Sequence, residues 1–224
     1  MKMKTKTAFI FDLDGVIVDT AKYHFIAWQR LAKKLDIDFT EKENEQLKGV
    51  SRVKSLEKIL SWGHKSISDE TFQELMHDKN QDYLNLISKM DENEILPGVK
   101  NFLTTLREND HPISLGSASK NAKTILKAVN LLEIFDVIVD GNHVEKGKPD
   151  PEVFLKACDQ LHTEPKNAIV FEDSIAGIQA ANAGGMMSIG IGKKEVLHEA
   201  DYCFENFNQF DYEFFQKIIS QTEI

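Results

Sequence analysis

Ala8-Phe9-Ile10-Phe11-Asp12-Leu13-Asp14-Gly15 is the stretch of sequence that decides the fold. Its apolar first half is typical of a strand that is buried on both faces in the centre of a parallel sheet. Two aspartates and a glycine follow directly, so the strand ends by presenting two carboxyl groups. Open parallel sheets bind ligands beyond the carboxyl ends of their strands. The stretch therefore predicts an α/β protein with Asp12 and Asp14 in its active site.

The same arrangement returns in the second half of the chain, where strand-like runs alternate with helical patterns. This alternation predicts right-handed crossovers and a Rossmann-like open parallel sheet. The runs lie at 113–116, 135–139, 168–171 and 187–191, and a last helix is expected near 212–219. Polar residues follow several of the runs, namely Ser117, Ser119, Lys148, Glu172 and Asp173. Because parallel strands end at one edge of the sheet, we expect these residues to lie near Asp12 and Asp14.

Between the first strand and Pro97-Gly98 the sequence shows helical periodicity and no convincing strand. We assign residues 17–92 to an inserted helical domain, and residues 1–16 with 93–224 to the α/β core domain. His24 is at the head of the apolar stripe of the first inserted helix, and Arg52 precedes the apolar stripe of the second. Lys79 falls in the middle of an apolar helix face, where a lysine is unexpected.

Composition excludes several classes of function. The net charge of −9, the pI near 5.3 and the lack of a block dense in Lys and Arg argue against a nucleic-acid-binding surface. No stretch approaches transmembrane length, and the apolar run after the basic start Met1–Thr7 ends too early for a signal peptide. Cys158 and Cys203 have no metal-binding spacing, so we expect free thiols and a cytoplasmic protein.

Carboxylates gathered at one sheet edge repel each other unless a cation lies among them. Mg²⁺ fits oxygen ligands and commonly bridges to a phosphate, so Asp12, Glu172 and Asp173 predict a magnesium and phosphate site, with Lys148 as a further cation. An aspartate can attack phosphorus and form an aspartyl-phosphate, and a second acid can move the proton. The helix start near Ser119 and Asn121 offers backbone N–H groups to phosphate oxygens.

Each motif alone has an ordinary structural alternative. Asp12-Leu13-Asp14-Gly15 could be a turn with solvated acids, and Glu172 with Asp173 could cap the following helix. Lys148 could be a surface lysine before a rigid helix start, and Lys79 could extend its amine to solvent. Arg52, His24 and the two serines are also unremarkable in isolation. The combination at the predicted sheet edge favours the active-site interpretation.

In order along the chain, Phe11–Val16, the residues around Ser117, Lys148-Pro149 and Glu172-Asp173 resemble the four motifs of the haloacid dehalogenase-like (HAD) superfamily. The helical insert resembles the α-helical cap of that superfamily. Within it, almost the whole chain is similar to the β-phosphoglucomutases. The stretches that carry this similarity are Asp19–His24, Leu47–Arg52, Ser117–Asn121 and Glu172–Ala180. Val18 and Glu145-Lys146-Gly147 depart from the family pattern without changing a reacting group.

The resemblance implies a role for each matching residue. Asp12 would be the phosphorylated nucleophile and Asp14 the general acid and base. One Mg²⁺ would be held by Asp12, the Asp14 backbone carbonyl, Glu172 and Asp173. Ser117 and Lys148 would bind the transferring phosphate, and Arg52, Ser119 and Asn121, with neighbouring Ala118, would bind the distal phosphate. Lys79 would contact the sugar. Thr20 and His24 would couple cap closure to Asp14, and Lys48 and Gly49 would lie in the specificity loop of the cap.

The implied activity is an isomerase reaction, the interconversion of β-D-glucose 1-phosphate and glucose 6-phosphate through β-glucose 1,6-bisphosphate. We expect a monomeric enzyme acting on a small sugar phosphate, with no nucleic-acid or membrane partner. A HAD-family sugar-phosphate phosphatase would use the same core and let water take the phosphoryl group. A catalytically silent phosphometabolite sensor is the alternative from another class, although retention of both Asp12 and Asp14 argues against it.

Overall fold

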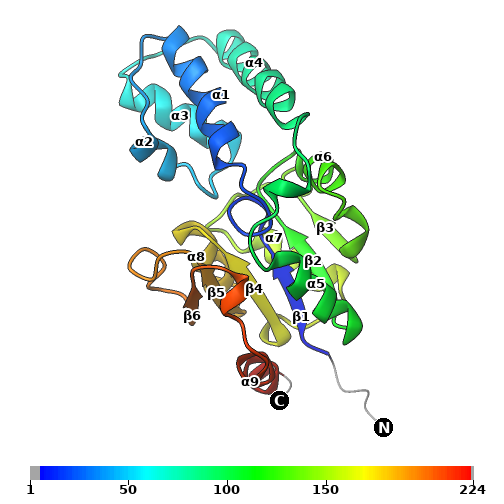
Figure 1. Ribbon diagram of the computed structural model, residues 1–224. Coiled ribbons are helices and arrows are strands. Elements are labelled where there is room, and N and C mark those ends of the chain that lie inside the picture. The colour runs from blue at the N-terminus through cyan, green and yellow to red at the C-terminus, as the bar shows by residue number, and fades with distance from the viewer. Residues whose placement is uncertain (1–5, 223–224) are drawn as a thin grey trace.

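A computed structural model describes residues 6–222. Its centre is one sheet of parallel strands in the order β3-β2-β1-β4-β5-β6, which confirms the predicted open parallel sheet (Figure 1). The strands are β1 (Ala8–Phe11), β2 (Ile113–Gly116), β3 (Val137–Val139), β4 (Ala168–Glu172), β5 (Met187–Ile191) and β6 (Tyr202–Phe204). The order reverses direction at β1, between β2 and β4, and such a switch point is where open α/β sheets bind ligands.

Successive residues of β1 point to opposite faces of the sheet, and both faces are covered. Phe9 and Phe11 pack with α5 (Val99–Glu108), α6 (Ala122–Ala128) and α9 (Tyr212–Thr222). Ala8 and Ile10 pack with α7 (Glu152–Gln160) and α8 (Ile175–Ala183). Short 3₁₀ turns complete the core at η2 (Leu132–Ile134), η3 (Pro165–Asn167) and η4 (Phe207–Gln209). The predicted strand, buried on both faces, is confirmed, and its burial fixes the position of Asp12.

The inserted segment forms a separate group of helices beyond the carboxyl ends of the strands (Figure 1). These helices are α1 (Ala21–Lys34), α2 (Glu41–Glu45), α3 (Arg52–Trp62) and α4 (Asp69–Ile87), and η1 (Glu92–Glu94) follows them. They enclose their own apolar cluster around Trp28, Leu56 and Ile59. We call α1–α4 the cap helices. The domain boundaries at 16/17 and 92/93 stay a prediction.

Several elements differ from the sequence-based expectation. Strand β6 and helix α2 were not predicted, because three and five residues respectively give too little periodicity to recognise. Strand β3 begins at Val137, two residues after the predicted start. Val53, predicted on the apolar stripe of α3, is 47% exposed and lines a cavity. Residues 1–5 of the basic start lie outside the described residues, and within residues 6–222 no helix is long and apolar enough to cross a membrane.

Candidate active site

A cavity of about 970 Å³ lies between the sheet edge and the cap helices. Most of the residues predicted for the site line its walls. From the α/β core they are Asp12, Asp14, Ser117, Ala118, Ser119, Asn121, Lys148 and Asp173, and from the inserted segment they are His24, Lys48, Gly49, Arg52 and Lys79. Thr20 and Glu172 do not line the cavity but contact residues that do. The structure thus brings together groups that are far apart in the sequence.

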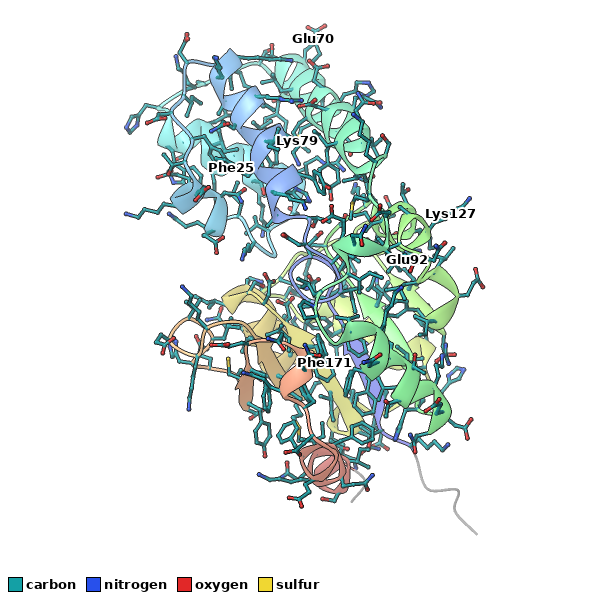
Figure 2. All side chains as sticks on the ribbon, in the orientation of Figure 1. Phe25, Glu70, Lys79, Glu92, Lys127 and Phe171 are labelled. Atoms are coloured by element: carbon teal, nitrogen blue, oxygen red, sulfur yellow. The ribbon has the colours of Figure 1, made fainter. Side chains whose placement is uncertain are left out.

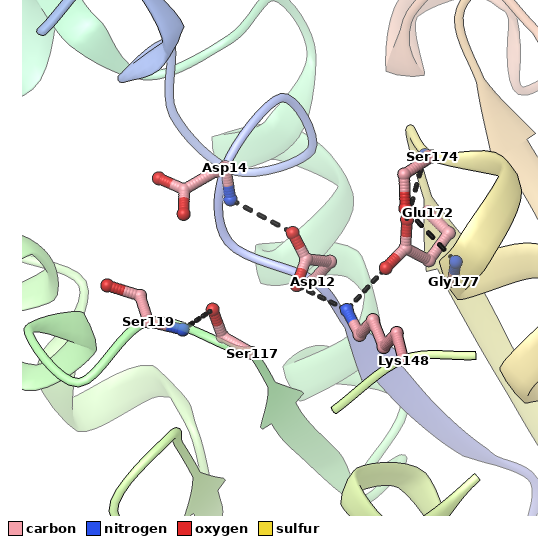
Figure 3. A network of polar contacts seen from close by, with 8 residues as sticks. All are labelled: Asp12, Asp14, Ser117, Ser119, Lys148, Glu172, Ser174 and Gly177. Atoms are coloured by element: carbon pink, nitrogen blue, oxygen red, sulfur yellow. Dashed lines mark hydrogen bonds and ion pairs between the residues drawn. The ribbon is translucent and has the colours of Figure 1, made fainter. Parts of the chain in front are cut away.

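Lys148 joins two carboxylates at the base of this cavity. Its Nζ donates to Asp12 Oδ1 at 2.6 Å and also to Glu172, and the network is shown in Figure 3. Burial by itself lowers the pKa of Lys148, but the Asp12 and Glu172 carboxylates outweigh it and raise the pKa above its usual value. The ammonium group therefore stays charged beside Asp12. The alternative that Lys148 is a surface lysine is wrong, since its side chain is buried.

Glu172 ends strand β4 and is fully buried. Its Oε2 accepts hydrogen bonds from the backbone N–H of Ser174 at 2.9 Å and from Ser174 Oγ at 2.8 Å. Ser174 also caps α8, because its Oγ accepts from Gly177 N at 3.1 Å. A Cβ at Gly177 would lie 1.9 Å from Glu172 Cδ, so the start of α8 leaves room for this carboxylate only with glycine there.

Asp12 and Asp14 have different surroundings although only one residue separates them. The Asp14 N–H donates to Asp12 Oδ2 at 3.1 Å, whereas the Asp14 carboxyl points away from Asp12 (Figure 3) and accepts a hydrogen bond from Thr20 Oγ1. Burial raises the pKa of Asp12 well above its usual value, against the effect of Lys148. Burial also raises the pKa of Asp14, and the Thr20 hydrogen bond opposes that rise.

A ladder of hydrogen bonds follows strand β2. Ser119 N donates to Ser117 Oγ at 3.1 Å, and Asn121 N donates to Ser119 Oγ at 3.3 Å. Two of the backbone N–H groups predicted to bind phosphate are therefore used within the loop. Each serine hydroxyl accepts one of these bonds and keeps its own O–H as a donor for a ligand.

Lys79 is 3% exposed on α4, and Figure 2 shows it within the group of cap helices. Its Nζ lies 3.0 Å from His24 Nδ1, 4.4 Å from the ring centre of Trp28 and 4.8 Å from that of Tyr83. Burial, with a smaller effect from Arg52, lowers the pKa of Lys79 to about 7. Burial and the Lys79 charge lower the pKa of His24 well below its usual value. The alternative that Lys79 extends to solvent is wrong, because the Lys79 side chain lines the cavity.

The loop between α2 and α3 places Lys48 and Gly49 on the cavity wall, and Arg52, the first residue of α3, also lines it. Lys48 Nζ lies 3.5 Å from Asp173 Oδ2 and 3.1 Å from Glu45 Oε2, so this lysine contacts a carboxylate of the α/β core. Gly49 has a φ of +70°, and a Cβ there would lie 2.6 Å from Ser174 Oγ. Among residues 6–222, Arg52 forms no ion pair, and it is half-buried with its pKa lowered by burial.

The donor set at the sheet edge suits a hard divalent cation. Asp12, Asp173 and the Asp14 backbone carbonyl offer only oxygen, which Mg²⁺ prefers. Burial, and after it the neighbouring charge of Glu172, raises the pKa of Asp173 to about 7. No three His, Cys, Asp or Glu side chains within residues 6–222 are arranged closely enough to hold a metal ion. The Glu172 carboxylate accepts hydrogen bonds from Lys148 and Ser174. A metal-binding role for Glu172 therefore stays a prediction.

Sequence reasoning missed some residues that shape the site. Trp28 and Tyr83 were assigned to apolar stripes, yet both line the cavity beside Lys79. Helical periodicity could have found them, because they share a face with His24 and Lys79. Gly15 has a φ of +79°, the left-handed conformation that glycine adopts readily. A Cβ at Gly15 would lie 2.1 Å from Asp173 Oδ2, and no sequence pattern predicts this close approach of Asp173 to Gly15.

Comparisons with known proteins show the family to which this chain is related. The family model described as haloacid dehalogenase-like hydrolase matches residues 9–191. The β-phosphoglucomutase of Bacillus subtilis is 44% identical over 87% of this chain and 87% of that protein. A phosphorylated carbohydrates phosphatase of Thermotoga maritima is 31% identical over 81% of this chain and 83% of that protein. The crystal structure of β-phosphoglucomutase from Clostridium difficile has a TM-score of 0.93 and 42% identity, and the match covers 96% of this chain and 98% of that one.

Proposed function

Because this chain belongs to the haloacid dehalogenase-like hydrolase family, we propose that it is a β-phosphoglucomutase, an isomerase that transfers phosphoryl groups. It interconverts β-D-glucose 1-phosphate and glucose 6-phosphate through an aspartyl-phosphate and β-glucose 1,6-bisphosphate. The proposed partner is the small sugar phosphate alone, with no nucleic acid or membrane. A monomer in the cytoplasm is part of the proposal, and the free thiols of Cys158 and Cys203 support a reducing compartment.

The observation that carries the proposal is the position of cations on two walls of one cavity. Lys148 lies beside Asp12 at the sheet edge, and Arg52 and Lys79 come from the cap helices. A bisphosphate needs positive groups at both of its ends, whereas a monophosphate needs one. A guanidinium group without a carboxylate partner is well suited to a second phosphate, since its planar donors match two phosphate oxygens.

The proposed reaction uses Asp12 and Asp14 in turn. In the first half, phosphorylated Asp12 gives its phosphoryl group to the 6-hydroxyl of β-glucose 1-phosphate, and the Asp14 carboxylate takes the hydroxyl proton. The bisphosphate then reorients in the cavity. In the second half, the Asp12 carboxylate attacks the phosphorus at C1, the P–O bond to the sugar breaks, and Asp14 returns the proton to the sugar oxygen. Glucose 6-phosphate leaves, and Asp12 is again phosphorylated.

The surroundings of the two aspartates suit this division of work. Burial raises the pKa of Asp12, and the positive charge of Lys148 opposes this rise, so Lys148 favours the ionised form that the nucleophile requires. Asp14 is directed toward Thr20 and has a raised pKa, as is expected of a group that must both hold and release a proton. The proposed Mg²⁺, held by Asp12, Asp173 and the Asp14 carbonyl with Glu172 nearby, would neutralise charge on the transferring phosphate.

A coupled assay tests the proposal. Purified protein with Mg²⁺ and a trace of β-glucose 1,6-bisphosphate should convert β-glucose 1-phosphate into glucose 6-phosphate. The Asp12→Ala variant should lose phosphorylation of the protein, and the Asp14→Ala variant should still bind the sugar phosphate but fail to turn it over. Inorganic phosphate as the main product would show a phosphatase instead. No turnover of any sugar phosphate would support the sensor alternative.

A further inference from the structure

Asn80 follows Lys79 on α4 and contacts the phosphate-binding loop of the α/β core. Asn121 Nδ2 donates a hydrogen bond to Asn80 Oδ1 at 3.0 Å, and both side chains are partly buried. Asn121 lines the cavity, whereas Asn80 does not. Adjacent helix residues point about 100° apart, so α4 directs Lys79 toward His24 and Asn80 toward Asn121. Asn80 thus touches the site through another residue.

The contact extends the ladder that begins at strand β2. Ser119 N binds Ser117 Oγ, Asn121 N binds Ser119 Oγ, and Asn121 Nδ2 binds Asn80 Oδ1. The ladder therefore runs from the residue after β2, near Asp12, to a helix of the cap. On another wall of the cavity, Lys48 contacts Asp173. Both of these contacts join the inserted segment to the core, and each of them uses a residue of the site.

The hydrogen bond to Asn80 also fixes the orientation of the Asn121 amide, with its nitrogen directed toward Asn80. The amide has one acceptor oxygen and a nitrogen with two donors, and the oxygen of Asn80 can accept only from that nitrogen. The second N–H of Asn121 Nδ2 remains available to an anion. An Asn121 side chain without this partner could turn its oxygen toward a phosphate, which would repel it.

We propose that Asn80 is a positioning residue for the distal phosphate: its oxygen holds the Asn121 amide with the donor end ready for the phosphate and ties the cap to the loop after β2. This inference rests on the proposed function, because a distal phosphate exists only for a bisphosphate or for a sugar phosphate held by its non-reacting end. It makes two separate claims, one about phosphate affinity and one about exclusion of water.

The first test is a double-mutant cycle on affinity. The Asn80→Ala variant should raise the KM for β-glucose 1-phosphate about fivefold, as expected for one lost hydrogen bond. The Asn121→Ala variant should raise it at least as much, and Asn80→Ala should add no further increase in the Asn121→Ala background. Independent, multiplying effects would overturn the proposal. Asn85→Ala, an exposed asparagine on the same helix, is the matched control and should leave KM unchanged.

The second test measures how much phosphate is lost to water. A looser cap admits water to phosphorylated Asp12, so Asn80→Ala should raise the ratio of inorganic phosphate to glucose 6-phosphate. Asn80→Asp keeps an acceptor for Asn121 Nδ2, so its ratio should stay at the wild-type value although its charge raises KM. If Asn80→Asp raises the ratio of inorganic phosphate to glucose 6-phosphate as much as Asn80→Ala does, the proposed role of the Asn80–Asn121 contact is refuted. If the role of Asn80 is purely structural, Asn80→Ala should lower Tm and change neither the KM nor the ratio of inorganic phosphate to glucose 6-phosphate.

Failure of the proposed function would be seen separately, in the wild-type protein. If the wild type hydrolyses sugar phosphates and makes no glucose 6-phosphate, the mutase proposal fails. The double-mutant cycle of Asn80→Ala and Asn121→Ala is then measured on the KM of hydrolysis. Coupling between Asn80 and Asn121 in that reaction would uphold the positioning role for a phosphatase. Independent effects there would refute it.

Discussion

Replacement of Lys79 by methionine should make the protein more stable and almost inactive. Lys79 is 3% exposed, and its ammonium group lies against Trp28 and Tyr83 with no carboxylate in an ion pair among residues 6–222. Burial of such a group disfavours its charged form, which is why its pKa falls to about 7. Methionine has a similar length and carries no charge, so it fills the same space without that cost.

The size of the effect follows from linkage between protonation and folding. A lysine whose pKa falls from 10.5 to about 7 destabilises the folded state by about 5 kcal/mol at low pH, at about 1.4 kcal/mol for each pKa unit. Cation–π contacts with the two aromatic rings offset about 1–2 kcal/mol of this. We therefore expect Lys79→Met to raise the free energy of unfolding by about 3 kcal/mol at pH 6.

The sign of the pH dependence is fixed by the direction of the shift. Between pH 7 and pH 10.5 the unfolded chain binds more protons at Lys79 than the folded chain, so the contribution of Lys79 to the stability of the wild type rises with pH in this window. The advantage of Lys79→Met should therefore shrink by about 1–3 kcal/mol between pH 6 and pH 9. Urea unfolding of both proteins at the two pH values measures it, with exposed Lys33→Met on α1 as the control.

Activity should fall in the same variant, because the cavity loses one of the cations that the inserted segment contributes. A variant that is less stable than the wild type at pH 6, or whose added stability is the same at pH 6 and pH 9, would refute the reasoning about a buried charge. A variant with normal turnover would refute the functional reason for keeping that charge.

Other variants and conditions test single contacts of the site. Gly177→Ala should destabilise the protein by about 1–3 kcal/mol in urea unfolding, because the new Cβ collides with buried Glu172; unchanged stability would mean that this carboxylate has room to move. Thr20→Val removes the hydrogen bond to Asp14, so the acidic limb of the rate profile should shift to higher pH, whereas Thr20→Ser should not shift it. Removal of divalent ions with EDTA should abolish turnover and added Mg²⁺ should restore it; full activity in EDTA would exclude the proposed metal.

The main features of the fold could be predicted from the sequence because they depend on local pattern. The apolar run of β1 is buried on both faces, and alternation of strands with helices gave the parallel sheet. Short elements such as α2 and β6 could not be predicted, since they have too few residues for a period to show. Val53 fits the apolar stripe of α3 in sequence but lies at the cavity, because periodicity gives the face of a helix and not what covers it.

The sequence alone determined which chemical groups are available and which of them lie at one edge of the sheet. A carboxyl group that follows a buried parallel strand must lie at that edge, because parallel strands end together. Only the tertiary structure decided how those groups are paired: Lys148 with Asp12 and Glu172, Thr20 with Asp14, Lys48 with Asp173, and Asn80 with Asn121. These pairs join residues from separate elements, and their distances and pKa values depend on burial and on neighbours that no local pattern specifies.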